Sequence, residues 1–251
     1  MLPIIMGPDS SDSKCVPMTY ADPHSIELEN LRIAYYTENS FVDPDESVKK
    51  TVSSVADVLS KEVLEVEENY PDATREFLEV SKGLNSFAVN IKKDSAPDSP
   101  DIDGVVELYP TRILDVTDEL LAQAKKSESV PNKQAMLGIE FFYWGMKLDA
   151  YRTRIIRFMN NYDAIVCPVA ARPAFDHGAP SEDSFNALDF LSYTHPYSFA
   201  GLPSVTLRAG TSSDGLPIGI QILTKHGQEG LALRLGMLVE DALGGWQPPS
   251  I

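Results

Sequence analysis

Residues 204–223 read S-V-T-L-R-A-G-T-S-S-D-G-L-P-I-G-I-Q-I-L and carry the clearest structural pattern of the chain. Apolar and polar residues alternate on both sides of a short loop that contains Asp214 and Gly215. The apolar positions are Val205, Leu207 and Ala209 before the loop, and Ile218, Ile220 and Ile222 after it. Such alternation predicts β-strands, and two strands joined by a short Asp-Gly loop predict a β-hairpin.

The loop also contains two serines, Ser212 and Ser213, which raises the question of a catalytic nucleophile. A nucleophile elbow has the sequence G-x-S-x-G and joins a strand to a helix. Here the glycine spacing differs, and a second strand follows the loop. We therefore expect the two serines to form a turn.

Outside this hairpin, strand-like and helix-like segments alternate along the chain. Strand-like segments are Leu31–Tyr36, Val63–Glu67 and Ala164–Val169, the last of which has the apolar character of a strand buried on both faces. Apolar residues at helical spacing predict helices within residues 43–59, 73–91 and 137–158. This alternation predicts an α/β protein.

Composition excludes several classes of partner. The 251 residues carry a net charge of -16, which disfavours nucleic acid and anionic membrane surfaces as partners. No apolar run approaches the ~20 residues that span a bilayer. The apolar start of the chain lacks the basic region of a signal peptide. With two cysteines and no disulfide pattern, we expect a cytoplasmic protein.

Reactive residues form no recognisable catalytic or metal-binding motif. The four histidines lack the H-x-x-x-H spacing of a metal site, and there is no glycine-rich phosphate loop, so we expect no metal and no cofactor. Cys167 and His177 leave a Cys-His nucleophilic pair open. The alternative is a buried, inert thiol in the predicted strand. The acidic, proline-containing stretch Asp94–Asp103 predicts a solvated loop.

Several stretches, in this order, resemble the amidase signature family of serine hydrolases across nearly the whole chain. They are G-P-D-S-S-D (Gly7–Asp12), L-R-I-A-Y-Y (Leu31–Tyr36), R-F-M-N-N-Y-D-A-I-V-C-P-V-A-A-R-P-A (Arg157–Ala174), F-A-G-L-P-S-V-T-L-R-A-G (Phe199–Gly210), D-G-L-P-I-G-I-Q-I-L (Asp214–Leu223) and G-G-W-Q-P-P (Gly244–Pro249). The resemblance implies a mixed sheet packed between helices. It also implies hydrolysis of amides by a nucleophilic serine, a second serine in a cis peptide and a lysine base.

The resemblance covers only the C-terminal half of the family's domain. In the family, the lysine and the Gly/Ser-rich signature precede the segment that Gly7–Asp12 resembles. We therefore expect residues 1–251 to be a partial amidase domain with no catalytic residue of its own, inactive alone and prone to self-association. The remaining lysines, such as Lys49 and Lys50, occur in polar contexts that keep the ammonium protonated.

If an upstream half completes the enzyme, this chain is expected to line the pocket for an amide-type small-molecule substrate. The candidate pocket residues are Phe142, Tyr143, Thr194 and Ser198. Phe142 and Tyr143 leave the main apolar stripe of their predicted helix. Thr194 and Ser198 place hydroxyls just before the family-like G-L-P turn.

Two alternatives to a partial amidase stay open. One is a non-catalytic remnant or interaction protein with the same fold, and the other is an unrelated hydrolase that uses Cys167 and His177. Within the family, the tRNA-amidating branch usually has an aspartate three residues before a Thr-x-Pro element. That element is Thr194–Pro196 here, and Leu191 stands at the aspartate position although Asp189 is close by.

Overall fold

The computed structural model describes residues 7, 17–84, 133–175 and 186–248, with the backbone alone for residues 133–137. It divides the chain into two units, Met1–Arg75 with Arg154–Ile251, and Glu76–Thr153. The expected loop Asp94–Asp103, His177 and most of the Gly7–Asp12 motif lie outside the described residues.

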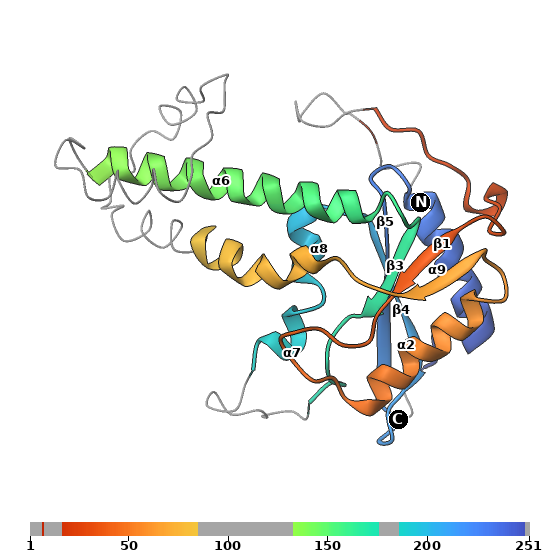
Figure 1. Cartoon of the computed structure of the whole chain (residues 1–251). Helices are drawn as coiled ribbons and strands as arrows, with labels where there is room; N and C mark the ends of the chain where they lie inside the picture. Colours follow the sequence, from red (N-terminus) through yellow and green to blue (C-terminus); the bar gives the residue numbers. More distant parts are fainter. Residues whose placement is uncertain (1–6, 8–16, 85–132, 176–185, 249–251) are drawn as a thin grey trace. The chain divides into compact units, whose positions relative to one another are not determined.

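The first unit contains a mixed five-stranded sheet in its described part, with the order β2-β1-β3-β5-β4 (Figure 1). β1 pairs in parallel with β2 and β3, while β5 pairs antiparallel with both β3 and β4. The strands are β1 (Arg32–Tyr35), β2 (Glu65–Glu68), β3 (Ala164–Pro168), β4 (Ser204–Thr211) and β5 (Pro217–Thr224). The α/β class and the mixed sheet expected from the sequence are thus confirmed.

The predicted hairpin is present, and its serines form the turn. The backbone N–H of Ser212 donates to the carbonyl of Leu216 (2.8 Å), and the Leu216 N–H donates to the Ser212 hydroxyl (3.1 Å). Gly215 has φ 82°, a left-handed conformation that glycine adopts without steric cost. Strand β5 follows at once, so this loop is no strand-to-helix elbow.

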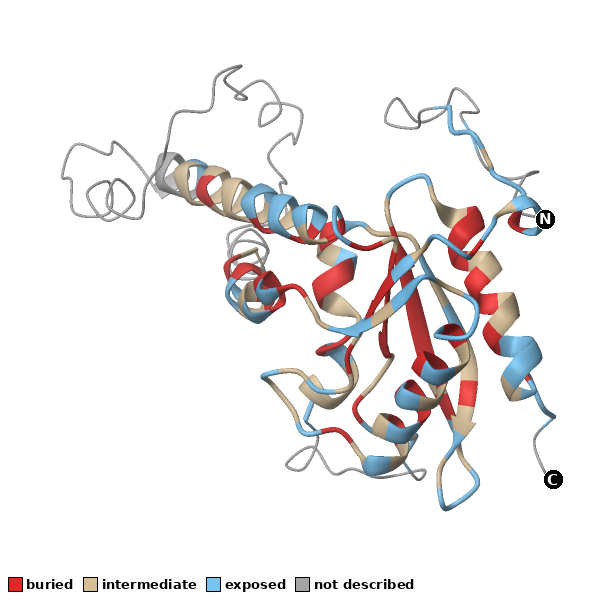
Figure 2. Cartoon of the chain, turned by 45° about the vertical axis from the view of Figure 1, so that its right-hand side comes forward, coloured by how far each residue is buried: buried red, intermediate tan, exposed pale blue. Residues whose placement is uncertain are grey.

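One face of the sheet carries the hydrophobic core under helices α2 (Glu46–Leu59) and α9 (Glu229–Leu243). The carboxylate of Asp45 caps α2 by accepting the Ser47 N–H (2.8 Å), and Gly244 ends α9 with φ 83°. Figure 2 shows the buried residues gathered on the sheet and on the inner sides of these helices. The core residues include Val52, Val55 and Leu59 of α2, Leu231, Leu235 and Val239 of α9, and Ile33, Val166, Ile220 and Ile222 of the sheet.

Shorter elements complete the described fold. They are η1 (Pro23–Ser25), η2 (Asp72–Glu76), α7 (Leu188–Leu191) and α8 (His195–Ala200). Figure 1 shows α7 and α8 on the side of the sheet opposite to α2 and α9. Both faces of the central strands are therefore covered, as the apolar run of β3 predicts.

The second unit contains a helix over residues 77–84 and most of the long helix α6 (Lys133–Phe158). These helices approach closely, because a Cβ added at Gly83 would lie 2.1 Å from the Trp144 ring. Tyr151 and Ile155, which belong to the predicted apolar stripe of α6, are buried, whereas Trp144 and Leu148 of the same stripe are half-buried. Tyr143, which leaves that stripe, is buried as well.

Candidate functional site

The carboxyl ends of β1, β2 and β3 lie at one edge of the sheet because these strands are parallel. After β1 the chain continues to α2 on the core face, whereas α7 and α8 follow β3 and lie on the opposite face (Figure 1). In open α/β sheets, ligands bind outside the carboxyl ends of strands at such a divergence. This edge is therefore the candidate functional site.

A tyrosine cluster occupies the edge just beyond β1. Tyr36 is 3% exposed, and its ring centroid lies 5.0 Å from that of Tyr70 and 5.9 Å from that of Tyr193. The Tyr197 hydroxyl donates to the Tyr36 hydroxyl (3.1 Å). Burial raises the pKa of Tyr36 well above its ordinary value, so this side chain remains a neutral phenol.

Gln221 ties the cluster to the sheet. Its side-chain Nε2 lies 2.8 Å from the carbonyl of Tyr193, 3.1 Å from the carbonyl of Pro168 and 3.2 Å from Cys167 Sγ. The Tyr193 hydroxyl in turn donates to the carbonyl of Thr37 (2.8 Å). The segment before α8 is thus fixed both to β5 and to the end of β1.

Cys167 is fully buried in β3 beneath this cluster. Burial raises the pKa of its thiol to about 12, although hydrogen bonds with Tyr36 and Gln221 oppose the effect. A thiol nucleophile acts as the thiolate, which this environment disfavours. The buried, inert thiol is therefore the interpretation that the geometry supports, and His177 lies outside the described residues.

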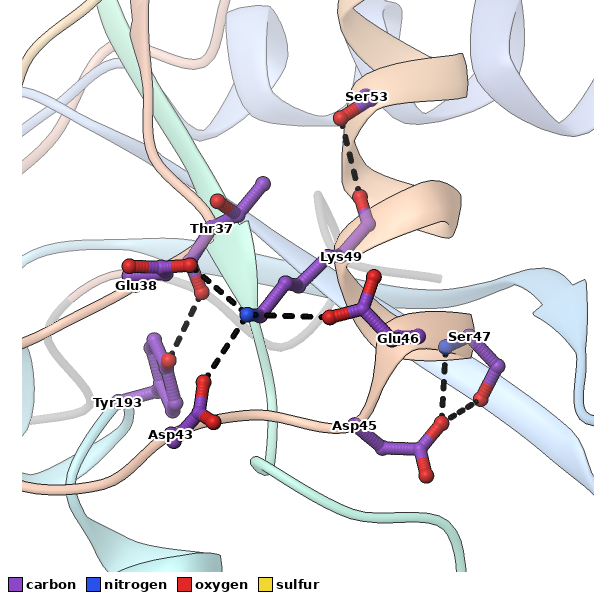
Figure 3. Close-up of polar contacts among 9 residues, drawn as sticks. All are labelled: Thr37, Glu38, Asp43, Asp45, Glu46, Ser47, Lys49, Ser53 and Tyr193. Carbon is purple, nitrogen blue, oxygen red and sulfur yellow. Dashed lines mark hydrogen bonds and ion pairs between the residues drawn. The ribbon is translucent and has the colours of Figure 1, made fainter.

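Lys49, on the first turns of α2, is surrounded by three carboxylates (Figure 3). Its Nζ lies 2.8 Å from Glu38 Oε1, 2.9 Å from Asp43 Oδ1 and 3.2 Å from Glu46 Oε1. Hydrogen bonds to Glu38 and Asp43 are the main cause of a raised Lys49 pKa. Lys49 therefore stays protonated, as its polar context predicts, and does not serve as a general base at neutral pH.

A polar cavity of about 490 Å³ opens at the ends of β1 and β2. It is lined by residues 36–39 and 68–70. Two of its side chains have structural hydrogen bonds: Asn39 Nδ2 donates to Ser192 Oγ (3.0 Å) and Asn69 Nδ2 donates to the Tyr162 hydroxyl (2.8 Å). The remaining polar lining is dominated by Glu38 and Glu68.

The structure places the four predicted pocket residues in two groups. Thr194 is half-buried before α8, and its carbonyl accepts a hydrogen bond from the exposed Ser198 hydroxyl (3.1 Å). Phe142, half-buried, and Tyr143, buried, are neighbours on α6 in the second unit. Thr194 and Ser198 immediately adjoin Tyr193 and Tyr197, so this pair lies next to the tyrosine cluster.

Sequence reasoning did not single out Tyr36, Tyr70 or Gln221. A usable signal existed for Tyr36, which directly follows a predicted parallel strand, and for Gln221, a polar residue inside an apolar strand. Near the Thr-x-Pro element, Leu191 is 37% exposed at the end of α7, and the Asp189 carboxylate pairs with Arg172 Nε (3.2 Å). The carboxylate of Asp189, the aspartate nearest to the Thr-x-Pro element, is thus already paired with Arg172.

Within the described ranges, no three His, Cys, Asp or Glu residues are grouped so that they could hold a metal ion. None of the helices described there is long and apolar enough to cross a membrane.

Comparison with known proteins agrees with this architecture. Residues 1–233 match the family model described as Amidase. A glutamyl-tRNA(Gln) amidotransferase subunit from Shouchella clausii is 30% identical over 253 aligned positions, covering 94% of this chain and 50% of the relative. The chain therefore spans about half the length of such relatives.

Two solved structures share the fold at lower sequence identity. A 6-aminohexanoate cyclic dimer hydrolase with substrate bound superposes with a TM-score of 0.62 at 23% identity, covering 94% of this chain and 51% of that one. A glutamyl-tRNA(Gln) amidotransferase subunit from Thermotoga maritima also gives 0.62, at 17% identity, with coverage of 94% and 48%.

Proposed function

Because this chain belongs to the amidase family, we propose that it forms the C-terminal portion of an amidase-type hydrolase that cleaves amide C–N bonds. The match of the family model to residues 1–233 carries the proposal. A separate segment or chain supplies the nucleophilic serine, the second serine and the lysine base. This chain supplies part of the sheet and part of the substrate pocket.

The reactive groups that the structure describes support this division of roles. The ammonium of Lys49 is neutralised by three carboxylates and stays protonated. The thiol of Cys167 is buried with a raised pKa, and the Ser212 hydroxyl accepts a turn hydrogen bond. A serine nucleophile requires an adjacent base, and the protonated Lys49 cannot serve as one. A cysteine nucleophile requires a thiolate, which the environment of Cys167 disfavours.

We propose that Thr194 and Ser198 contact the substrate and, independently of them, that Phe142 and Tyr143 do so. Thr194 and Ser198 support this role because they adjoin the tyrosine cluster at the carboxyl edge of the sheet. Phe142 is half-buried and offers aromatic surface for an apolar part of the substrate, and Tyr143 is its buried neighbour. The substrate class is an amide-bearing small molecule.

A tRNA-amidating role is the candidate that the name of the Shouchella clausii relative suggests. Two observations disfavour it for this chain. Leu191 replaces the aspartate of the Thr-x-Pro element, and the neighbouring Asp189 is already paired with Arg172. The net charge of -16 also opposes contact with a phosphate backbone.

A non-catalytic interaction protein is the second candidate, because the same unactivated residues fit it equally well. The two candidates differ in what a catalytic half does when it is added. A partial enzyme gains hydrolysis on mixing with a separately expressed segment that carries the Ser-Ser-Lys machinery of a relative. An interaction protein gains none.

The direct test assays the purified 251-residue chain with p-nitroanilides and aryl amides, and treats it with a serine-directed fluorophosphonate. We expect hydrolysis equal to buffer and no labelled serine. Loss of one oxyanion donor alone lowers kcat by roughly 10²–10³-fold, and this proposal assigns the nucleophile and the base to another segment as well. Turnover that survives repurification, or stoichiometric labelling of one serine, contradicts the proposal.

A further inference from the structure

We propose that the polar cavity at the ends of β1 and β2 binds a small organic cation, a primary alkylammonium group. This inference goes beyond the proposed amide hydrolysis, because it concerns binding by the described residues alone. The cavity volume of about 490 Å³ is within the range of small-molecule sites.

The charge of the lining selects a cation. Glu38 and Glu68 contribute carboxylates, and neither Lys nor Arg belongs to the described lining. Glu38 shares the Lys49 ammonium with two other carboxylates. Glu68 forms no ion pair with any residue in the part of the chain that the structure describes. An anion entering this cavity meets the unpaired carboxylate of Glu68, whereas an ammonium gains that carboxylate as a partner.

The aromatic lining favours an organic cation over a metal ion. Tyr36 and Tyr70 place their rings 5.0 Å apart, tilted by 33°, beside the carboxylates. The guanidinium of Arg75 lies 5.7 Å from the Tyr70 ring centroid and donates to the Tyr70 hydroxyl (2.9 Å), so a ligand cation has only the part of Tyr70 that lines the cavity. An alkylammonium group can place its charge near Glu68 and its methylene groups against Tyr70, since Tyr36 is only 3% exposed.

A divalent metal fits this cavity less well. Magnesium and calcium require six or more oxygen ligands. The amide side chains of Asn39 and Asn69 are already engaged, with both Phe41 and Val42 donating backbone N–H groups to Asn39 Oδ1 (2.9 and 3.1 Å). Among the described residues, no group of three suitable ligands occurs. The chemistry of the lining is that of a carboxylate-aromatic site.

The test is saturation-transfer NMR of the full 251-residue chain with n-butylammonium at constant ionic strength. We expect saturable binding with a Kd in the millimolar range, since exposed charge pairs are weak. Glu68→Gln and Tyr70→Leu should each weaken binding about fivefold or more, while Tyr70→Phe keeps the ring and should retain it. Glu62→Gln is the matched control, because Glu62 is exposed and outside the lining.

Neutral butan-1-ol should bind at least about fivefold more weakly, and butyrate should not bind. No saturable binding of butylammonium, equal binding of butan-1-ol, or an equal loss in Glu62→Gln and Glu68→Gln overturns the proposal. Melting curves for each variant confirm that it is folded, and Glu68→Gln remains the test of the site if Tyr70→Leu does not fold.

A further binding experiment distinguishes a simple alkylammonium ligand from a ligand that carries both an ammonium group and an amide. Tighter binding of 4-aminobutanamide than of butylammonium identifies an amide-bearing ligand, and equal binding identifies the ammonium group alone. Both results support the cation site, whereas equal binding of butanamide and 4-aminobutanamide contradicts it. None of these measurements depends on hydrolysis, so failure here leaves the proposed function standing.

Discussion

The hydroxyl of Tyr193 donates a 2.8 Å hydrogen bond to the carbonyl of Thr37, which joins residues 156 positions apart. Tyr193 is fully buried, and its own carbonyl lies 2.8 Å from Gln221 Nε2. One residue therefore links the end of β1 to β5 through two polar contacts. The candidate pocket residue Thr194 follows it directly.

Replacing Tyr193 by phenylalanine should lower the free energy of unfolding by about 1–2 kcal/mol. The substitution leaves the Thr37 carbonyl without this donor in a partly buried position, at a cost typical of a lost hydrogen bond. Urea unfolding followed by circular dichroism measures the change. Tyr20→Phe is the matched control and should alter stability by no more than about 0.5 kcal/mol.

Stability should fall as pH rises above about 10.4, the ordinary pKa of lysine. The folded pKa of Lys49 is raised, so its ion pairs contribute fully below the unfolded pKa and are lost as pH rises through the folded pKa. Buried Tyr36 and Tyr193, whose pKa values are also raised, add to the loss in the same direction.

The Lys49→Met variant isolates the lysine contribution. Urea midpoints measured at about pH 9 and about pH 11.5, on either side of the ordinary lysine pKa, should fall less in this variant than in the unchanged chain. Lys50→Met is the control, since Lys50 is exposed on the same helix. If Lys49→Met and Lys50→Met show the same alkaline decrease, the ion-pair cluster does not contribute as the geometry indicates.

Cys167 should resist alkylation in the folded chain. With a pKa of about 12, its thiolate fraction at about pH 7.5 is on the order of 10⁻⁵, and burial blocks access as well. Iodoacetamide treatment followed by peptide mass spectrometry should find Cys167 unmodified in buffer and fully modified in about 6 M guanidinium, a concentration typical of full unfolding. Rapid modification of Cys167 without denaturant would reopen the Cys-His hypothesis.

Alanine at Phe142, Tyr143, Thr194 or Ser198 should change substrate preference in a reconstituted enzyme. We expect ratios of kcat/KM between two amides to shift by about 10-fold where a side chain touches substrate, since contacts of roughly 1–3 kcal/mol are typical of pocket groups. Ser213→Ala in the hairpin turn serves as the control. Unchanged selectivity at all four positions would remove them from the pocket.

Local features were predictable from sequence because their causes are local. The alternation around Asp214 and Gly215 specifies the hairpin, and apolar spacing specifies a helix within residues 43–59. This helix begins only at Glu46, after the cap Asp45, so Pro44 lies before it. Strand β2 begins at Glu65 rather than at the predicted Val63, because Glu65 pairs with Arg32 of β1. No local sequence pattern indicates that pairing.

The site depends on contacts between distant segments. Of the three carboxylates at Lys49, Glu46 lies three residues away on the same helix, whereas Glu38 and Asp43 reach it through the loop before α2. The approach of Tyr36, Tyr193 and Gln221 depends on the pairing of β1, β3 and β5. Sequence patterns identify the strands but not which side chains meet at their ends.

The parallel pairing of β1 with β3 also constrains synthesis on the ribosome. The backbone N–H of Arg32 bonds the carboxylate of Asp163, 131 positions later, and Ile33 pairs with Ala164. During translation β1 can pair with β2 early. The edge of β1 that pairs with β3 stays unpaired until β3 has left the exit tunnel. At roughly 5–20 residues per second, that interval lasts several seconds or longer, a period in which a nascent chain needs protection from association.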